Sequence, residues 1–202
     1  MYYKDELKIY YLFALVDGSV SEEENLRFAE LCNSKEFGEY KKEEIINDCV
    51  NLLNNKSKST EENVISEIDA MFRWRFININ DKQRIFWNII NLAYSDKKLS
   101  ASEAKVVEYL KKKLDIPENI NQEMIDIAKT MVLLTEQKET LEVDSEKNKE
   151  EIKNIDSKIS VLFGQVKSLV ELYDIVWLKE DKNAITIFSY CRNCRFCCIG
   201  IG

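Results

Sequence analysis

Two short acidic stretches, DGSVSEEE at residues 17–24 and DKKLSASE at residues 96–103, govern how this sequence is interpreted. They lie in one frame, because at the offset that relates them Ala14 also matches Ala93 and Leu31 matches Leu110. A repeated acidic turn is typical of a calcium loop, of a pair of helix starts, or of a duplicated domain. The three interpretations differ in what they require of the side-chain oxygens.

A complete calcium loop requires oxygen ligands at positions 1, 3, 5, 7, 9 and 12, with glycine at position 6. The first stretch fits from position 5 onward, with Asp17, Gly18 and Glu24 in place. Positions 1 and 3 fall on residues without a carboxylate, which are Phe13 and Leu15 in the first stretch and Leu92 and Tyr94 in the second. Lys97 also replaces the glycine of the second stretch. The sequence therefore argues against a complete calcium loop.

The helix-start interpretation accounts for the residue types with fewer assumptions. A Ser followed three residues later by Glu forms a capping box, in which each side chain bonds to the backbone N–H of the other residue. The chain has two such pairs, Ser21 with Glu24 and Ser100 with Glu103. Asp17 and Asp96 precede them at positions where a short carboxylate accepts hydrogen bonds from nearby backbone N–H groups. Each stretch is predicted to be a helix–turn–helix corner, with Ser21 and Ser100 as helix caps.

The composition predicts an all-α protein. The 202 residues are 45% hydrophobic and 32% charged, with only five Gly and one Pro to interrupt helices. The net charge of −7 and the lack of a long basic run argue against a nucleic-acid partner. No stretch is apolar for long enough to predict a membrane span, and MYYKDELKIYYLF at the N-terminus lacks the apolar core of a signal peptide. We therefore expect a cytoplasmic location.

Histidine is absent, which removes the His-dependent catalytic triads and His-ligated metal sites. The sequence also shows no Gly-rich phosphate loop and no cofactor fingerprint. We expect a protein that is not an enzyme, with no certain cofactor.

Beyond residue 120 the hydrophobic pattern changes. A heptad seam with steps of three and four residues runs through 152–176, namely Ile152, Ile155, Ile159, Leu162, Val166, Leu169, Tyr173 and Val176. Traced backwards, the pattern continues to Met124 but is interrupted by the charged run DSEKNKEE at 144–151. The segment is therefore either one long helix or a helical hairpin. Its seam either packs on its own domain or serves a protein partner or self-association.

The C-terminal sequence SYCRNCRFCCIGIG places Cys191, Cys194, Cys197 and Cys198 within eight residues. Such spacing is typical of the first ligands of an iron–sulfur or zinc site, although the fourth Cys does not lie at the usual spacing. The alternative is an apolar tail, or a short strand at 184–190 that completes the fold. A metal- or redox-sensing protein is thus the second interpretation of the chain.

The two corners, ALVDGSVSEEE and AYSDKKLSASE, resemble the paired signature of the TerB-like family of tellurite-resistance proteins, which extends to the N-terminal domain of a J-domain co-chaperone. The resemblance covers about residues 1–125. It implies a compact helical bundle that acts as a binding or scaffolding module in resistance to tellurite, phage or other stress. It also implies a divalent-cation site at Asp17, Glu24, Asp96 and Glu103, with Lys97 departing from the pattern.

These observations predict three parts: a TerB-like bundle at 1–120, a heptad-patterned helical arm at 121–178 and a Cys-rich tail at 179–202. The expected function is a stress or defence module that acts through protein contacts.

Overall fold

Helices account for every regular element that the structure describes. The structure is a computed structural model that describes residues 3–34, 39–54, 60–73, 77–95, 99–144 and 146–180, with the backbone alone at residues 3, 34, 39, 40 and 171–180. Within these ranges it contains α1 (Tyr3–Ala14), α2 (Glu22–Ser34), α3 (Glu39–Asn54), α4 (Thr60–Phe72), α5 (Ile79–Ala93), α6 (Ala101–Lys113), α7 (Glu118–Glu142) and α8 (Lys149–Glu180), and no strand. The predicted all-α class is confirmed. The strand considered at 184–190 lies outside the described residues.

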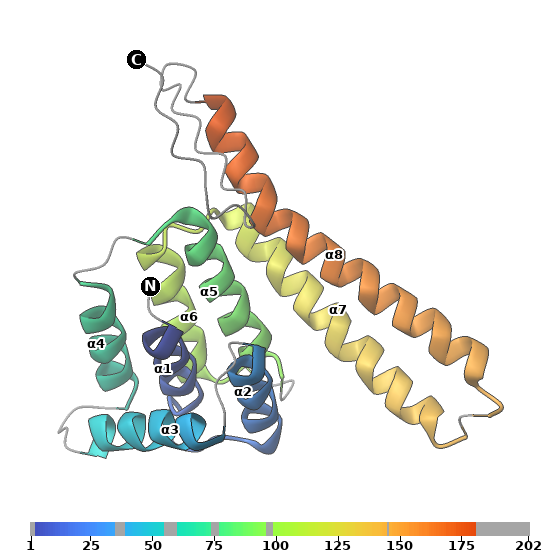
Figure 1. The fold of residues 1–202 in the computed structure, drawn as a ribbon, viewed down its shortest axis with the longest axis horizontal. Helices are drawn as coiled ribbons and strands as arrows, with labels where there is room; N and C mark the ends of the chain where they lie inside the picture. The colour runs from blue at the N-terminus through green and yellow to red at the C-terminus, as the bar shows by residue number, and fades with distance from the viewer. Residues whose placement is uncertain are drawn as a thin grey trace, which may run out of the picture.

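The first helix is the centre of the bundle. It packs against α2, α3, α4 and α5, which surround it (Figure 1). A helix in that position needs apolar residues on almost all sides. The sequence supplies them, because every residue from Ile9 to Ala14 is buried, and Ile9, Tyr10, Leu12 and Phe13 are fully buried.

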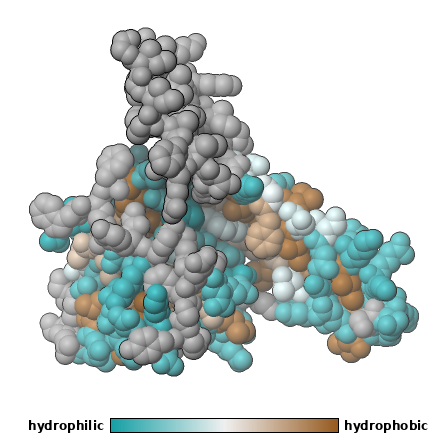
Figure 2. Space-filling view, in the orientation of Figure 1, coloured by the Kyte–Doolittle hydropathy of each residue, from teal (hydrophilic) through white to brown (hydrophobic). Residues whose placement is uncertain are grey.

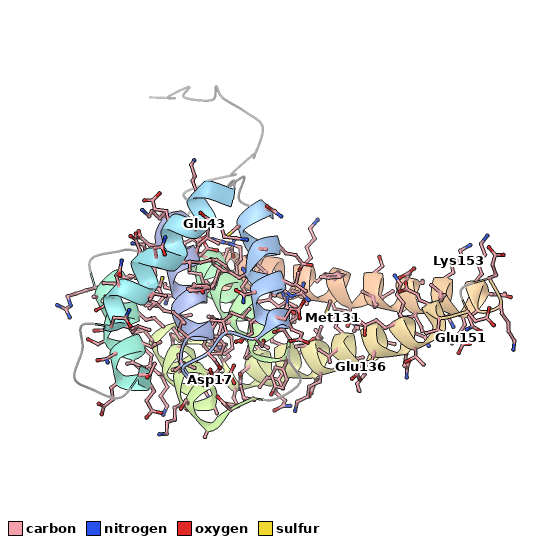
Figure 3. All side chains as sticks on the ribbon, turned by 90° about the horizontal axis from the view of Figure 1, so that it is seen from below. Asp17, Glu43, Met131, Glu136, Glu151 and Lys153 are labelled. Atoms are coloured by element: carbon pink, nitrogen blue, oxygen red, sulfur yellow. The ribbon has the colours of Figure 1, made fainter. Side chains whose placement is uncertain are left out.

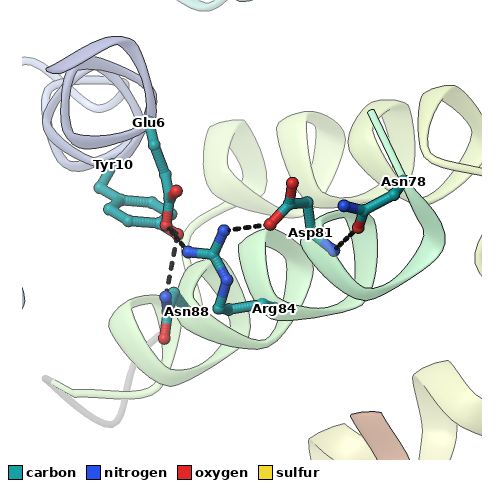
Figure 4. A network of polar contacts seen from close by, with 6 residues as sticks. All are labelled: Glu6, Tyr10, Asn78, Asp81, Arg84 and Asn88. Carbon is teal, nitrogen blue, oxygen red and sulfur yellow. Dashed lines mark hydrogen bonds and ion pairs between the residues drawn. The ribbon is translucent and has the colours of Figure 1, made fainter. Parts of the chain in front are cut away.

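A buried charge network joins α1 to α5 (Figure 4). Glu6 is fully buried, accepts a hydrogen bond from the Tyr10 hydroxyl at 2.6 Å and forms an ion pair with Arg84. The second guanidinium nitrogen of Arg84 lies 2.5 Å from Asp81, while Asn88 donates to the Tyr10 hydroxyl at 2.9 Å. Burial, followed by the neighbouring Glu6 carboxylate, raises the pKa of Tyr10 well above its ordinary value. Tyr10 therefore acts in the network as a neutral donor.

Local signals set the ends of α5 and α6. The side chain of Asn78 caps α5 by accepting from the Asp81 N–H at 2.8 Å. At the end of α6, Asp115 adopts a left-handed φ of 58°, and the Ile116 N–H bonds to the Lys111 carbonyl at 3.0 Å. This is a Schellman motif, and it stops α6 just before α7 begins.

The last two helices form a hairpin, the arm, that projects from one side of the bundle (Figure 1). The hairpin alternative is therefore correct, and the charged run at 144–151 contains its turn. Lys138 on α7 and Asp156 on α8 bridge the two helices at 2.8 Å. The helices α7 and α8 pack together and both contact α5.

The heptad seam of α8 is used within the chain. Ile155, Val166 and Leu169 are buried, and Ile159 and Leu162 are partly buried against the core. Of the two uses predicted for the seam, the structure shows packing on the chain's own helices over the residues whose side chains are described. Tyr173 and Val176 lie beyond those side chains.

The arm does not begin where the bundle ends. Met124, Ile127, Ala128 and Met131 of α7 belong to the same buried cluster as α1 and α5, together with Val166 and Leu169 of α8. The predicted boundary at residue 120 therefore separates residues that share one core. None of the helices in the described ranges is long and apolar enough to cross a membrane.

Candidate functional site

Both predicted capping boxes are present. The Ser21 N–H donates to Oε2 of Glu24 at 2.8 Å, and the Glu24 N–H donates to the Ser21 hydroxyl at 3.1 Å. The corresponding distances at Ser100 and Glu103 are 2.6 and 3.1 Å. Each box satisfies two N–H groups that the first turn of a helix leaves without an intrahelical partner. The roles assigned to Ser21 and Ser100 are confirmed.

The first corner turns through Asp17 and Gly18. Oδ1 of Asp17 accepts from the Ser19 N–H at 3.2 Å, as expected for a short carboxylate in a turn. Gly18 has a φ of 97°, a backbone conformation that residues with a Cβ atom rarely adopt. Both residues are exposed. In the second corner, Asp96 and Lys97 lie outside the described residues.

The capping glutamates of the two corners influence one another electrostatically. Glu24 is 5% exposed, and burial raises its pKa to about 7. The hydrogen bonds from Ser21 oppose this rise, whereas the negative charges of Glu103 and Asp17 add to it. Glu103 is also buried. Folding thus brings together two carboxylates that are far apart in the sequence.

This arrangement predicts a pH-dependent stability. In the unfolded chain Glu24 ionises near pH 4.5, but in the folded chain it ionises near pH 7. The folded state therefore binds the proton more tightly, and the stabilisation from this group is lost as the pH rises through that window. We expect Glu24→Gln, which can keep the capping box, to raise the free energy of unfolding at pH 8 by about 1–2 kcal/mol. The gain should vanish near pH 4.5, as measured by urea denaturation at a series of pH values.

Glu22→Gln is the matched control, because Glu22 is an exposed acid in the same helical turn. The free energy of unfolding of this control should depend on pH in the same way as that of the wild type. A Glu24→Gln profile that keeps the full wild-type dependence between pH 5 and 8 would contradict the role of Glu24.

The described residues do not by themselves complete a metal site. No group of three or more His, Cys, Asp or Glu among them is placed to hold an ion. Glu24 and Glu103 each direct Oε2 to a backbone N–H, and Asp17 directs Oδ1 to Ser19. The cation predicted at Asp17, Glu24, Asp96 and Glu103 stays a prediction.

The cysteines fall into two groups. Cys32 and Cys49 are buried free thiols, and burial raises the pKa of Cys49 to about 12. A buried thiol that resists ionisation is a poor nucleophile and a poor metal ligand, so Cys49 is a core residue. Cys191, Cys194, Cys197 and Cys198 lie outside the described residues, so the zinc or iron–sulfur interpretation stays a prediction.

The arm carries apolar side chains that are exposed. Leu133 on α7 and Val161 and Phe163 on α8 are 58%, 60% and 50% exposed. Figure 3 shows Met131 where the arm leaves the bundle, and Glu151 and Lys153 near its far end. On the face drawn in Figure 2, hydrophobic surface lies along the part of the arm beside the bundle.

A groove of about 370 Å³ lies between α2 and the arm. Its apolar lining comes from Leu26 of α2, Met131 and Val132 of α7, and Ile159 and Phe163 of α8. The sequence patterns did not identify this groove, because Leu26 and Phe163 lie outside the periodic core positions. A large apolar residue beside a helical seam is the signal that could have indicated it.

Comparison with known proteins gives no relative from which a role could be transferred. No protein-family model, no curated protein and no solved structure matches the chain significantly. The class that the fold and site define is a helical bundle with a projecting helical hairpin.

Proposed function

We propose that this chain is a non-enzymatic, TerB-like module of stress or phage defence that acts by binding another protein through its arm. The resemblance of the two corner motifs supports the TerB-like part of the proposal. The capped corners agree with a scaffold role, since both capping glutamates accept hydrogen bonds from the backbone.

One observation carries the assignment of binding to the arm. Contacts between α7 and α8 close its inner seam, yet Leu133, Val161 and Phe163 remain at least half exposed, and Phe163 lies in the groove beside α2. Exposed apolar side chains that line a groove, as Phe163 does with Leu26 and Ile159, are typical of a protein-interaction surface. A preformed hairpin also loses less conformational entropy on binding than a segment that must fold first.

The proposal predicts that the exposed apolar side chains of the arm hold the partner. We expect Val161→Ser combined with Phe163→Ser to reduce the partner recovered with the tagged full chain by about tenfold, equivalent to about 1.4 kcal/mol. Both positions are at least half exposed, so the fold should be retained, which circular dichroism can verify. Recovery would be measured by quantitative mass spectrometry after capture from the native cell.

Leu99→Ser is the matched control, because Leu99 is a partly exposed apolar residue just before α6 and not on the arm. It should leave recovery unchanged. A photoreactive residue at position 163 should also crosslink to the partner, whereas one at Glu43, on α3 and away from the arm in Figure 3, should not. Equal recovery with the arm variant and the control would refute the proposal.

A further inference from the structure

The groove between α2 and the arm has acidic walls. Glu23 and Glu30 line it from α2, and Glu136 and Glu139 line it from α7. Arg27 also lines the groove, but its guanidinium lies 2.5 Å from the Glu30 carboxylate. Among the described residues that line the groove, four carry a carboxylate and one a guanidinium, so their formal charge is negative. Negative charge on two facing, partly apolar walls focuses the electrostatic potential between them.

Apolar side chains also line the same groove, together with the polar residues Asn91, Ser95 and Thr135. Leu26 on one wall is 62% exposed and Phe163 on the other is 50% exposed. Met131 is largely buried beneath them. A ligand that covers Leu26 and Phe163 would remove apolar surface from water. Each Å² of apolar surface buried in this way stabilises the complex by about 25 cal/mol. A ligand that fits must therefore combine an apolar face with positive charges along its edges.

The length of the groove indicates the form of that ligand. The lining residues of α7 run from Met131 to Glu139, which spans about 12 Å at about 1.5 Å per residue. That is roughly two turns of a second helix. An amphipathic helix laid in an apolar groove is a recurring mode of peptide recognition.

We propose that this groove binds a cationic amphipathic helical segment of a partner protein. Its apolar face lies against Leu26 and Phe163, and its Lys or Arg side chains meet Glu136 and Glu139 on one wall and Glu23 on the other. The inference rests on the proposed function, because it names the chemistry of the partner that the arm holds.

The first test is fluorescence anisotropy of the full chain with a labelled synthetic helix of Leu and Lys at amphipathic spacing. This peptide should bind saturably, and raising the salt from about 50 to about 300 mM should weaken it severalfold by screening. A twin peptide with Glu in place of Lys, and another with Ser in place of Leu, should show no saturable binding. Equal binding of the Glu twin would overturn the proposal.

The second test places the peptide in the groove. Glu136→Gln with Glu139→Gln should weaken the Leu/Lys peptide by about tenfold. Glu150→Gln with Glu151→Gln is the matched control, because it removes the same charge from exposed positions of the arm that do not line the groove. The control pair should change the affinity less than about twofold. An equal loss from both pairs would show non-specific attraction and overturn the proposal.

Two further measurements distinguish two other occupants of the groove. The segment 181–202 carries Arg192 and Arg195, so a gain in peptide affinity on reversing both charges to Glu would assign the groove to the chain's own end and overturn the proposal. A dimer in light scattering that Glu136→Gln with Glu139→Gln dissociates would assign it to a second copy, with the same consequence. A partner crosslinked at position 163 without any binding of the Leu/Lys peptide would leave the proposed function standing and remove this inference alone.

Discussion

Replacing Arg84 by Met is expected to lower the free energy of unfolding by about 3–5 kcal/mol, because it leaves the Glu6 carboxylate in the core without its ion pair. Glu6 is fully buried beneath α5, and the Tyr10 hydroxyl at 2.6 Å cannot neutralise its charge. An uncompensated buried charge is among the largest effects of a single substitution. Equilibrium denaturation in urea would measure the loss.

The matched control is Lys105→Met, which breaks the pair between Lys105 and Glu61 at 2.7 Å on the surface. Lys105 is 63% exposed there, so the loss should be under about 1 kcal/mol. A double variant, Arg84→Met with Glu6→Gln, should recover part of the stability, since the charge is removed with its partner. A loss at Arg84 as small as that at Lys105 would show that the network does not hold α1 to α5.

The second large effect is expected at the base of the arm, where Leu169→Ala should destabilise the whole bundle by about 2–5 kcal/mol. Leu169 is 7% exposed and belongs to the buried cluster that contains α1 and α5. Truncating it removes apolar contacts and leaves a cavity between α8 and the bundle. Urea denaturation followed by helical circular dichroism should show a lower midpoint for one cooperative transition.

Ile155→Ala is the informative comparison. Ile155 is 4% exposed but lies outside that cluster, in the part of the hairpin that projects from the bundle. Its truncation should mainly speed hydrogen exchange of amides in the arm, because local openings are governed by local contacts. Protection lost equally in α1 and in the arm would show that the arm and bundle unfold together, and would contradict a separate local opening.

The placement of Leu169 also shows why a sequence-based boundary at residue 120 separates residues of one core. The heptad seam indicates that Ile155, Val166 and Leu169 are buried, but it does not say by what. In the structure Val166 and Leu169 join the bundle core, while Ile155 does not. Apolar periodicity predicts which face of a helix is buried, and the identity of the covering element depends on distant contacts.

The candidate site likewise combines features that local sequence predicts with features that depend on distant contacts. Ser21 with Glu24 and Ser100 with Glu103 were predictable because a capping box links residues three positions apart. The raised pKa of Glu24 was not, since it depends on burial and on the charge of Glu103 from another helix. The groove between Leu26 and Phe163 could not be predicted from the sequence either, because its two walls come from α2 and from the arm.

The sequence by itself determined the all-α class and the capped starts of α2 and α6, whereas the choice between one long helix and a hairpin came from the structure. The class and the caps depend on interactions among residues a few positions apart, or on a composition with few helix breakers. Only the tertiary structure decided that α1 is buried on nearly all sides, that the arm shares the core of the bundle, and that an acidic groove opens beside α2. These features arise where helices distant in the sequence meet, and the packing of whole faces, rather than local spacing, selects which faces meet.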